Sequence, residues 1–338
     1  MILAGDIGGT KTNIALFQTN AGQSRPQLLA EQTFHSGNFA GLEQIVALFL
    51  ESRKQAPTLE GACFGVAGPI VDRSSRIPNL PWVIDADSLQ RAFSLPQVTL
   101  INDLEATAEG IAALNPDELE TLNAGVPSTG TLQCGAVIAA GTGLGMAVLQ
   151  PIGGQWIPAA SEGGHADYAP RNEKEMALLA FLLGRHQRVS TERVVSGPGL
   201  HAIYDFVVAL GKLTPNPDLA RAIAANKEEA PAQIGQAALA KQCPACVEAL
   251  DLFAAAYGAC AGNLGLTALS SGGLFLGGGI ATKILPKLRD GTFMTAFKAK
   301  GRLSPLVERM PVHVILNPQA PLFGAARRAL RDRAATLR

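Results

Sequence analysis

The stretch LAGDIGGTKTNIALF, Leu3 to Phe17, decides the fold. It holds glycines, a lysine and a threonine, but a P-loop needs a glycine directly before the lysine, and Thr10 stands there. A dinucleotide fingerprint is also excluded, because the glycines lack the G-x-G-x-x-G spacing and no helical pattern follows them. The run NIALFQT is extended and aliphatic, without the caps of a helix start. The stretch therefore predicts a strand, a glycine turn and a second strand.

The same plan returns in CGAVIAAGTGLGMAVLQPIG, residues 134–153. Gly135 to Ala140 is typical of a buried strand, GTGLG of a glycine turn, and Met146 to Gln150 of the returning strand. Because glycines lack Cβ atoms, the backbone N–H groups of such turns can approach anionic oxygens closely. Two such hairpins can hold the two ends of one triphosphate, and they suggest two related halves.

The rest of the chain alternates strands and helices up to about residue 170 and is mostly helical beyond it. Helix 42–55, strand 61–66 and strand 98–102 followed by a helix indicate a mainly parallel sheet with crossover helices. The uncharged run 252–282 is long enough to span a bilayer, but its polar residues and glycines divide it into a core helix and a short strand. At 338 residues, the chain is long enough for two domains.

The composition indicates which kinds of partner the protein binds and in which compartment it works. The formal net charge is zero and only 17% of residues are charged, so we expect small-molecule ligands and no nucleic acid or membrane partner. Five cysteines are too few for a disulfide framework and favour a reducing compartment. Asp6 interrupts the apolar start before a signal peptide could form. These features predict a cytoplasmic protein.

Two further motifs carry reactive side chains. In INDLEA, Asp103 follows the buried strand VTLI, and open α/β sheets place reactive groups at the carboxyl ends of strands. A carboxylate there can accept the proton of an alcohol during phosphoryl transfer, although an Asn-Asp helix cap is the alternative. In SEGGHADYAP, Glu162 and His165 suit the hydroxyl groups of a sugar, and their glycines leave room for it. A zinc ligand and a plain surface loop are the alternatives for that motif.

The motifs together resemble a known family. Asp6-Ile-Gly-Gly-Thr10 and Gly141-Thr-Gly-Leu-Gly145 resemble the two phosphate loops of the sugar kinase, heat-shock protein and actin superfamily. Within it, INDLEA, SEGGHADYAP, TERVVSGPGL and LFLGGGIA resemble the bacterial ATP-dependent glucokinase family over almost the whole chain. The resemblance implies a two-domain α/β fold of the ribonuclease H-like (actin-like ATPase) type with an interdomain cleft. The smaller domain would be residues 1–110 plus 318–338, and the larger domain residues 111–317.

The resemblance also implies roles for individual residues. The nucleotide-binding residues would be Asp6, Gly8, Gly9, Thr10, Lys11, Gly141, Thr142, Gly143, Gly277, Gly278 and Gly279, with Asp6 also serving the metal. The sugar-binding residues would be Asn79, Asn102, Asp103, Glu162, His165 and Glu192, with Asp103 as the catalytic base. Taken alone, Glu192 is typical of a capping box, and Gly277 to Gly279 of a tight strand-to-helix turn.

The implied activity is transfer of the γ-phosphoryl group of ATP, with Mg²⁺, to the 6-hydroxyl of D-glucose by a cytoplasmic homodimer. GGTKT is closer to ROK kinases, so a kinase for mannose, fructose or an N-acetylhexosamine stays open, although the cysteine-rich zinc motif of ROK kinases is missing. A sugar-responsive regulator would need a helix-turn-helix before the first glycine turn, where five residues precede Asp6. A chaperone-like ATPase would hydrolyse ATP without sugar.

Overall fold

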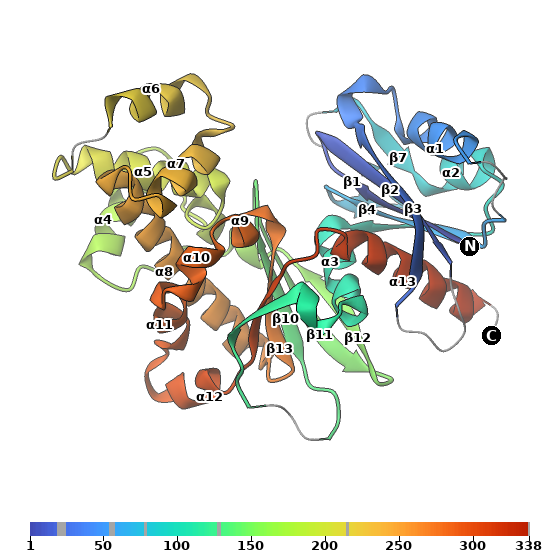
Figure 1. The fold of residues 1–338 in the computed structure, drawn as a ribbon. Coiled ribbons are helices and arrows are strands. Elements are labelled where there is room, and N and C mark those ends of the chain that lie inside the picture. The colour runs from blue at the N-terminus through green and yellow to red at the C-terminus, as the bar shows by residue number, and fades with distance from the viewer. Residues whose placement is uncertain (19–24, 54–57, 78–79, 127–129, 214–215, 337–338) are drawn as a thin grey trace. The chain divides into compact units, whose positions relative to one another are not determined.

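The structure is a computed structural model that describes residues 1–18, 25–53, 58–77, 80–126, 130–213 and 216–336. The chain divides into two compact units, and Figure 1 shows its elements. The smaller unit contains Met1–Leu119, Trp156–Ala160 and Asn317–Arg338, and the larger unit contains Glu120–Gln155 and Ser161–Leu316. The C-terminal helix therefore groups with the N-terminal third of the chain.

The smaller unit is built on a mixed sheet. The strands of this sheet are β1 (Ile2–Ile7), β2 (Lys11–Gln18), β3 (Gln27–His35), β4 (Gly61–Val66) and β8 (Val98–Asn102). They lie in the order β3-β2-β1-β4-β8, with β1, β4 and β8 parallel. A second, antiparallel sheet contains β5 (Ile70–Val71), β6 (Ser74–Arg76) and β7 (Val83–Asp85). The helices are α1 (Leu42–Glu51), α2 (Ala86–Ala92), α3 (Asp103–Gly110) and α13 (Ala320–Thr336).

Strand β1 is buried on both faces, as the period of two in a strand allows. Leu3 and Ile7 point into a core that α1 and α2 complete, whereas Ile2 and Ala4 point into a core that α3 and α13 complete. Figure 1 shows these two helix pairs on opposite sides of the sheet. A central strand covered on both faces explains why the opening stretch is almost wholly apolar.

Helices α3 and α13 pack at unusually short range. A Cβ atom on Gly324 of α13 would lie 1.7 Å from the carbonyl oxygen of Ala106, and one on Gly110 of α3 would lie 2.0 Å from that of Ala320. Ion pairs from Arg328 to Glu105 and from Arg331 to Glu109 join the same two helices. The C-terminal helix thus fixes α3, the helix that begins at Asp103.

The larger unit combines a second mixed sheet with nine described α-helices. The strands are β9 (Leu119–Asn123), β10 (Gly135–Ala140), β11 (Leu144–Ile152), β12 (Gln155–Ser161), β13 (Gly273–Gly277) and β14 (Val312–Ile315). The helices are α4 (Glu173–Leu183), α5 (Gly197–Ala209), α6 (Pro217–Ala225), α7 (Ala230–Leu239), α8 (Pro244–Ala268), α9 (Gly278–Lys283), α10 (Leu285–Arg289), α11 (Thr292–Lys298) and α12 (Ser304–Glu308). Residues 156–160 of β12 group with the smaller unit.

The two units repeat one strand plan. The order β2-β1-β4-β8 in the smaller unit corresponds to β11-β10-β13-β14 in the larger one: each begins with an antiparallel hairpin and continues with parallel strands. Both predicted glycine hairpins are therefore confirmed, and the topology supports two related halves. The prediction of a mainly parallel sheet is wrong, because the glycine hairpins and β3 add antiparallel pairs to each parallel set.

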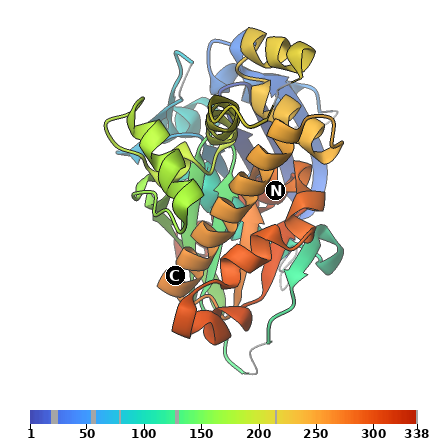
Figure 2. The ribbon, with the colours of Figure 1, turned by 90° about the vertical axis from the view of Figure 1, so that its left-hand side faces the viewer.

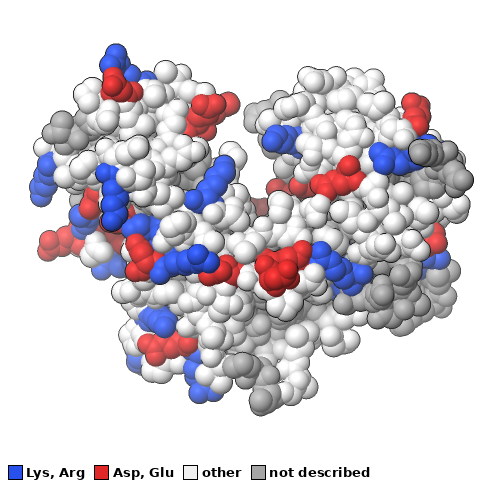
Figure 3. All heavy atoms as spheres, viewed as in Figure 1, with Lys and Arg blue, Asp and Glu red and all other residues white. Residues whose placement is uncertain are grey.

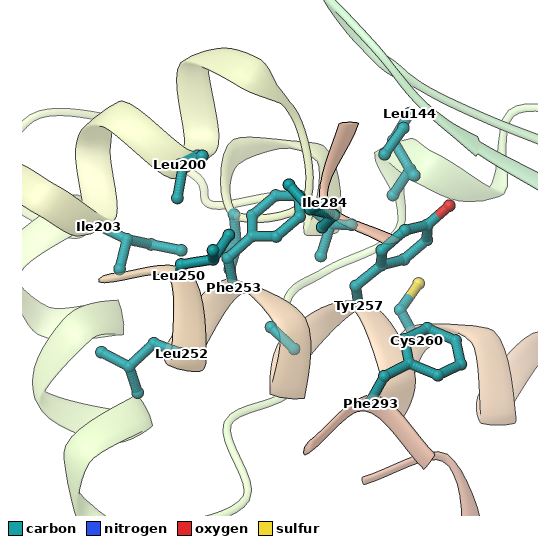
Figure 4. Close-up of a cluster of buried hydrophobic side chains, with 14 of the residues drawn as sticks. Leu144, Leu200, Ile203, Leu250, Leu252, Phe253, Tyr257, Cys260, Ile284 and Phe293 are labelled. Atoms are coloured by element: carbon teal, nitrogen blue, oxygen red, sulfur yellow. The ribbon is translucent and has the colours of Figure 1, made fainter. Parts of the chain in front are cut away.

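Helix α8 is the centre of the larger unit's core. It packs against α5, α7 and α11, and Figure 2 shows this helical face. Figure 4 shows Phe253 and Tyr257 of α8 among Leu200, Ile203 and Phe293. By length and composition α8 could cross a membrane, but 72% of its most apolar window is buried inside the protein, as in a core helix. The predicted core helix and following strand are confirmed.

The surface carries no large field of one sign on the face that Figure 3 shows. Basic and acidic side chains alternate there, as the formal net charge of zero suggests. Many charged side chains of the described residues are paired, for example Arg188 with Asp167 and Arg73 with Asp87. Such exposed ion pairs contribute little to stability and do not indicate a ligand-binding site.

Candidate active site

In the smaller unit, two carboxylates lie at the carboxyl ends of parallel strands. Asp6 is in β1, Asp103 follows β8, and β4, whose Gly65 pairs with Asp6, lies between these two strands. A Cβ on Gly65 would lie 2.8 Å from the Cβ of Ala106 in the first turn of α3, so the glycine lets the start of α3 approach the sheet. Burial and the negative charge of Asp103 raise the pKa of Asp6 to about 6. The sequence motifs around both residues thus converge on one edge of the sheet.

Asp103 is the first residue of α3, and Asn102 is its N-cap. The N–H of Leu104 donates to Asn102 Oδ1 at 2.9 Å and to Asp103 Oδ1 at 2.8 Å. The predicted helix cap is therefore confirmed for Asn102. Desolvation by the surrounding protein raises the pKa of Asp103, and the Leu104 N–H opposes this, while the side chain stays open to solvent. Capping occupies Oδ1 and leaves Oδ2 of Asp103 available to a ligand.

The first glycine turn, Gly8 to Lys11, is held by hydrogen bonds within the turn and from Ser36. The N–H of Gly8 donates to the carbonyl of Lys11 at 2.9 Å. The buried hydroxyl of Ser36 donates to the Gly8 carbonyl at 2.8 Å, and the Ser36 N–H donates to the Thr10 carbonyl at 3.0 Å. The Ser36 hydroxyl also lies 3.0 Å from that of Thr12. Among the described backbone hydrogen bonds, none uses the N–H of Gly9 or Thr10.

The second glycine turn, Gly141 to Gly145, belongs to the larger unit. The N–H of Gly141 donates to the Gly143 carbonyl at 2.9 Å, and the Gly141 carbonyl accepts from the N–H of Gly197, the first residue of α5, at 2.8 Å. The N–H groups of Thr142 and Gly143 take no part in the described backbone hydrogen bonds. Both turns therefore present two backbone donors each, as an anion site needs.

The loop with Glu162 and His165 lies against the second glycine turn. Glu162 Oε2 is 3.8 Å from His165 Nε2, and both side chains are exposed. A Cβ on Gly164 would lie 2.0 Å from the Leu144 carbonyl oxygen. The expectation that the loop's glycines leave room for a sugar is thus wrong for Gly164, because backbone of β11 already fills that space.

Glu192 is not a capping-box residue. It lies in a short 3-10 helix, Thr191–Arg193, and its Oε2 accepts from the N–H of Leu144 at 2.9 Å. A Cβ on Gly143 would be 2.7 Å from the same oxygen, so a larger residue there would displace the Glu192 carboxylate. The structure brings Glu192 together with the second glycine turn and with the loop that carries His165.

Gly277, Gly278 and Gly279 make the turn from β13 into α9, as the strand-to-helix alternative predicted. Gly278 has a φ of 81°, and a Cβ there would lie 2.4 Å from the Ala140 carbonyl oxygen. Gly279 is exposed and nothing lies within 4 Å of its Cβ position. Gly278 is therefore required by the fold, and Gly279 leaves open space beside the second hairpin.

One predicted residue, Asn79, lies outside the described residues. Two polar residues were missed by the sequence analysis. Asn13 pairs with Asp6 across β1 and β2, its Nδ2 lies 3.5 Å from Asp6 Oδ2, and Thr33 fixes its Oδ1. Counting residues across the glycine turn would have found Asn13, whereas Ser36 follows a strand whose pairing the sequence does not reveal.

The described residues contain no group of three or more His, Cys, Asp or Glu side chains that could hold a metal ion. That finding removes the support for a zinc site at His165 within this part of the chain. The pair of Asp6 and Asp103 is a different case, because two nearby carboxylates whose pKa values are both raised suit a hard divalent cation bound mainly by oxygen atoms of a phosphate and water.

Comparisons with known proteins agree with this arrangement. The family model described as Glucokinase matches residues 3–332. The glucokinase of Nostoc punctiforme is 44% identical over 342 residues, which cover 98% of this chain and 99% of that protein. A glucokinase crystal structure from an Antarctic psychrotroph is 31% identical, with a TM-score of 0.84 and 98% of each chain covered. A Streptomyces griseus ROK family glucokinase, solved with glucose and AMPPNP, shares the fold at 22% identity, with a TM-score of 0.63 over 98% of this chain and 99% of that one. This chain therefore belongs to the glucokinase family of sugar kinases and has their actin-like ATPase fold.

Proposed function

We propose that the protein transfers the γ-phosphoryl group of ATP to the 6-hydroxyl group of D-glucose, giving glucose 6-phosphate and ADP. Membership of the glucokinase family supports this substrate pair, as does the Streptomyces griseus relative solved with glucose and the ATP analogue AMPPNP. The structural observation that carries the proposal is the Asp103 carboxylate, which begins α3 beside Asp6 and has one oxygen free of the helix cap.

Asp103 acts as the general base. As the sugar oxygen attacks the γ-phosphorus, Oδ2 of Asp103 takes the hydroxyl proton and the bond from the phosphorus to the bridging oxygen of ADP breaks. The N–H of Leu104 holds Oδ1, so the carboxylate is oriented before the sugar arrives. A raised pKa makes Asp103 a better proton acceptor than an ordinary aspartate, provided that it is ionised.

Asp6 would hold Mg²⁺, which neutralises charge on the β- and γ-phosphates when it is bound. The residues fit this ion, because burial and the repulsion from Asp103 both raise the Asp6 pKa, and a bound cation stabilises the ionised carboxylate against both effects. Asn13 and, behind it, Thr33 keep the Asp6 side chain in place by a chain of polar contacts. The chain's own contribution is thus a held, partly buried carboxylate.

The two glycine turns bind the phosphates of ATP. The N–H groups of Gly9 and Thr10 in the first turn and of Thr142 and Gly143 in the second are the donors, with Gly8 and Gly141 shaping the turns. Lys11 is exposed at the first turn and contributes a positive charge. The turn at Gly277, Gly278 and Gly279, exposed at its last two residues, accepts the adenosine, with the open side at Gly279.

Polar side chains bind the hydroxyl groups of the sugar. The proposed ligands are Asn79, Asn102, Asp103, Glu162, His165 and Glu192. Asn102 keeps its Nδ2 as a donor after its Oδ1 has capped α3. Glu162 and His165 are exposed and adjacent, so together they offer acceptors and a donor to neighbouring hydroxyl groups.

The proposal extends to the setting of the enzyme. We assign the first phosphate-binding turn and the base to residues 1–110 with 318–338, and the second phosphate-binding turn with the remaining sugar and adenosine contacts to residues 111–317. All five cysteines are free, which favours a reducing cytoplasm. A homodimer, as the family resemblance implies, is checked by light scattering after gel filtration.

A coupled assay of ADP release tests this function. Glucose, mannose, fructose, glucosamine and N-acetylglucosamine are compared at equal concentration with a control that lacks sugar. The proposal predicts the highest kcat/KM with glucose and almost no ADP release without sugar. Preference for another hexose would replace glucose as the substrate, and equal turnover without sugar would indicate an ATPase and contradict the proposal.

A further inference from the structure

The segment 188–197 connects the loop that carries His165 to the second glycine turn. We propose that Glu192 is a positioning residue for this turn, beyond any contact with sugar, and that it holds the turn and the loop in one arrangement. The inference rests on the proposed function, because the turn is taken to bind phosphates. It assigns to Glu192 an effect on the nucleotide that a sugar ligand alone would lack.

The contacts to the glycine turn come from both ends of the segment. Glu192 Oε2 accepts from the Leu144 N–H at 2.9 Å, and the Gly197 N–H donates to the Gly141 carbonyl at 2.8 Å. These two bonds hold the turn on either side of Thr142 and Gly143, whose N–H groups remain for a ligand. A hydrogen bond to a carboxylate is stronger than a neutral one, so the Glu192 contact is the firmer of the two.

The contacts to the other loop come from the first half of the segment. Thr191 donates to the Ala166 carbonyl from its N–H at 2.8 Å and from its hydroxyl at 3.2 Å. Arg188 donates to the His165 carbonyl at 2.8 Å and forms an ion pair with Asp167. Glu192 follows Thr191 directly, so one short stretch of backbone contacts both functional loops.

Glu192 is itself held firmly. The Ser196 hydroxyl donates to the Glu192 carbonyl at 2.7 Å and accepts from the N–H of Gly199 as the N-cap of α5. On the far side of the contact, the Leu144 side chain is buried in the core near Tyr257 of α8, as Figure 4 shows. The carboxylate and the Leu144 N–H are therefore both anchored to the framework of the larger unit.

This arrangement orients the donors of the turn before ATP binds. Backbone N–H groups stabilise an anion best when they need no reorganisation on binding. Without the Glu192 acceptor, the Leu144 N–H loses its partner, and the turn can take other conformations. Loss of Glu192 should therefore weaken ATP binding even when the sugar site is saturated.

Three variants test the inference. Glu192→Ala removes the acceptor, Glu192→Gln keeps an acceptor oxygen, and Glu162→Ala is the matched control, because Glu162 is also a proposed sugar ligand but makes no described contact with the turn. At saturating glucose we expect the KM for ATP to rise roughly 10-fold or more in Glu192→Ala, to rise by less than about 3-fold in Glu192→Gln, and to stay unchanged in Glu162→Ala. All three should raise the KM for glucose, because Glu162 and Glu192 are both proposed sugar ligands.

Hydrogen exchange of the ligand-free protein gives a readout that needs no substrate. The peptide covering residues 141–145 should exchange faster in Glu192→Ala than in the wild type, and at the wild-type rate in Glu162→Ala. If Glu192→Ala does not fold, Glu192→Asp, which withdraws the carboxylate by one methylene, replaces it with the same expectation.

Wild-type exchange and an unchanged KM for ATP in Glu192→Ala would overturn the inference and leave Glu192 as a sugar ligand at most. Equal losses in Glu192→Ala and Glu192→Gln would also contradict it, because the acceptor oxygen would then not matter. Failure of the proposed function looks different: the wild-type protein itself would show no glucose-dependent turnover, while the exchange difference at residues 141–145 could still appear.

Discussion

Asp6 and Asp103 lie at the carboxyl ends of β1 and β8, with only β4 between those strands, and the charge of Asp103 helps to raise the pKa of Asp6 to about 6. Such like-charge pairs are unfavourable for folding and are typical of functional sites. The relationship gives a direct way to separate the stability of the protein from its activity.

Replacing Asp6 by Asn should stabilise the protein and abolish its kinase activity. The pKa of Asp6 is about 6 in the folded protein and 3.8 ordinarily, so its contribution to stability is present below pH 3.8 and is lost as the pH rises through 6. Asparagine does not ionise, so Asp6→Asn should not lose this stability, and its free energy of unfolding at pH 7 should exceed that of the wild type by roughly 1–3 kcal/mol. Denaturant unfolding of both proteins at pH 4 and pH 7 measures this difference in the free energy of unfolding.

The control for this experiment is Asp85→Ala. Asp85 caps α2, and its hydrogen bond with Ser88 lowers the pKa of Asp85, so this variant should be less stable than the wild type at pH 7. If Asp6→Asn were less stable than the wild type at pH 7, the prediction would be wrong. An equal gain in the free energy of unfolding at pH 4 and pH 7 would also contradict it, because the gain would then not come from the ionised Asp6 carboxylate.

Ser36 should control the first glycine turn. Its hydroxyl donates to the Gly8 carbonyl and lies within hydrogen-bond distance of Thr12, and all three groups are at least partly buried. Ser36→Ala should raise the KM for ATP by a few-fold, as expected for one neutral hydrogen bond, with little change in the KM for glucose. Because Thr12 acts through Ser36, adding Thr12→Val should have little further effect on the KM for ATP. Additive effects of the two changes would contradict this relay.

Gly324 should be required for the close packing of α3 against α13. A methyl group at this position would meet the carbonyl oxygen of Ala106 at 1.7 Å, so Gly324→Ala must separate α3 from α13. We expect a loss of about 1–3 kcal/mol of stability and a lower kcat, because α3 carries Asp103. Gly37→Ala is the control, since nothing lies within 4 Å of the Cβ position there. Thermal melting and steady-state kinetics of both variants give the comparison.

Much of this structure could be predicted from local patterns. The two glycine hairpins, the core helix α8 and the cap at Asn102 follow from hydrophobic periodicity and turn chemistry, which act over a few residues. The mixed character of the sheets was missed, because the sequence shows strands but not which strands pair. Glu192 was open to a capping interpretation because its partner, Leu144, is 48 residues away in the sequence.

Glycines illustrate the same limit. Gly164 and Gly278 suggested space for ligands, yet both are required by close contacts with backbone, at Leu144 and Ala140 respectively. A glycine that admits a ligand and one that admits a neighbouring strand look identical in a sequence. Only the packing in the structure tells them apart. It leaves open space at the neighbouring Gly279, where nothing lies within 4 Å of the Cβ position.

The central claim is that Asp103 accepts the proton of the sugar hydroxyl, and the kcat of Asp103→Asn tests it most directly. Asparagine can still accept from the Leu104 N–H, so the start of α3 and the binding of glucose should persist, while proton transfer is lost. Initial rates of glucose 6-phosphate formation, with glucose affinity measured separately by calorimetry, should show a kcat reduced by roughly two to four orders of magnitude and a glucose affinity within a few-fold of wild type. A kcat within a few-fold of wild type in the folded variant would contradict the account.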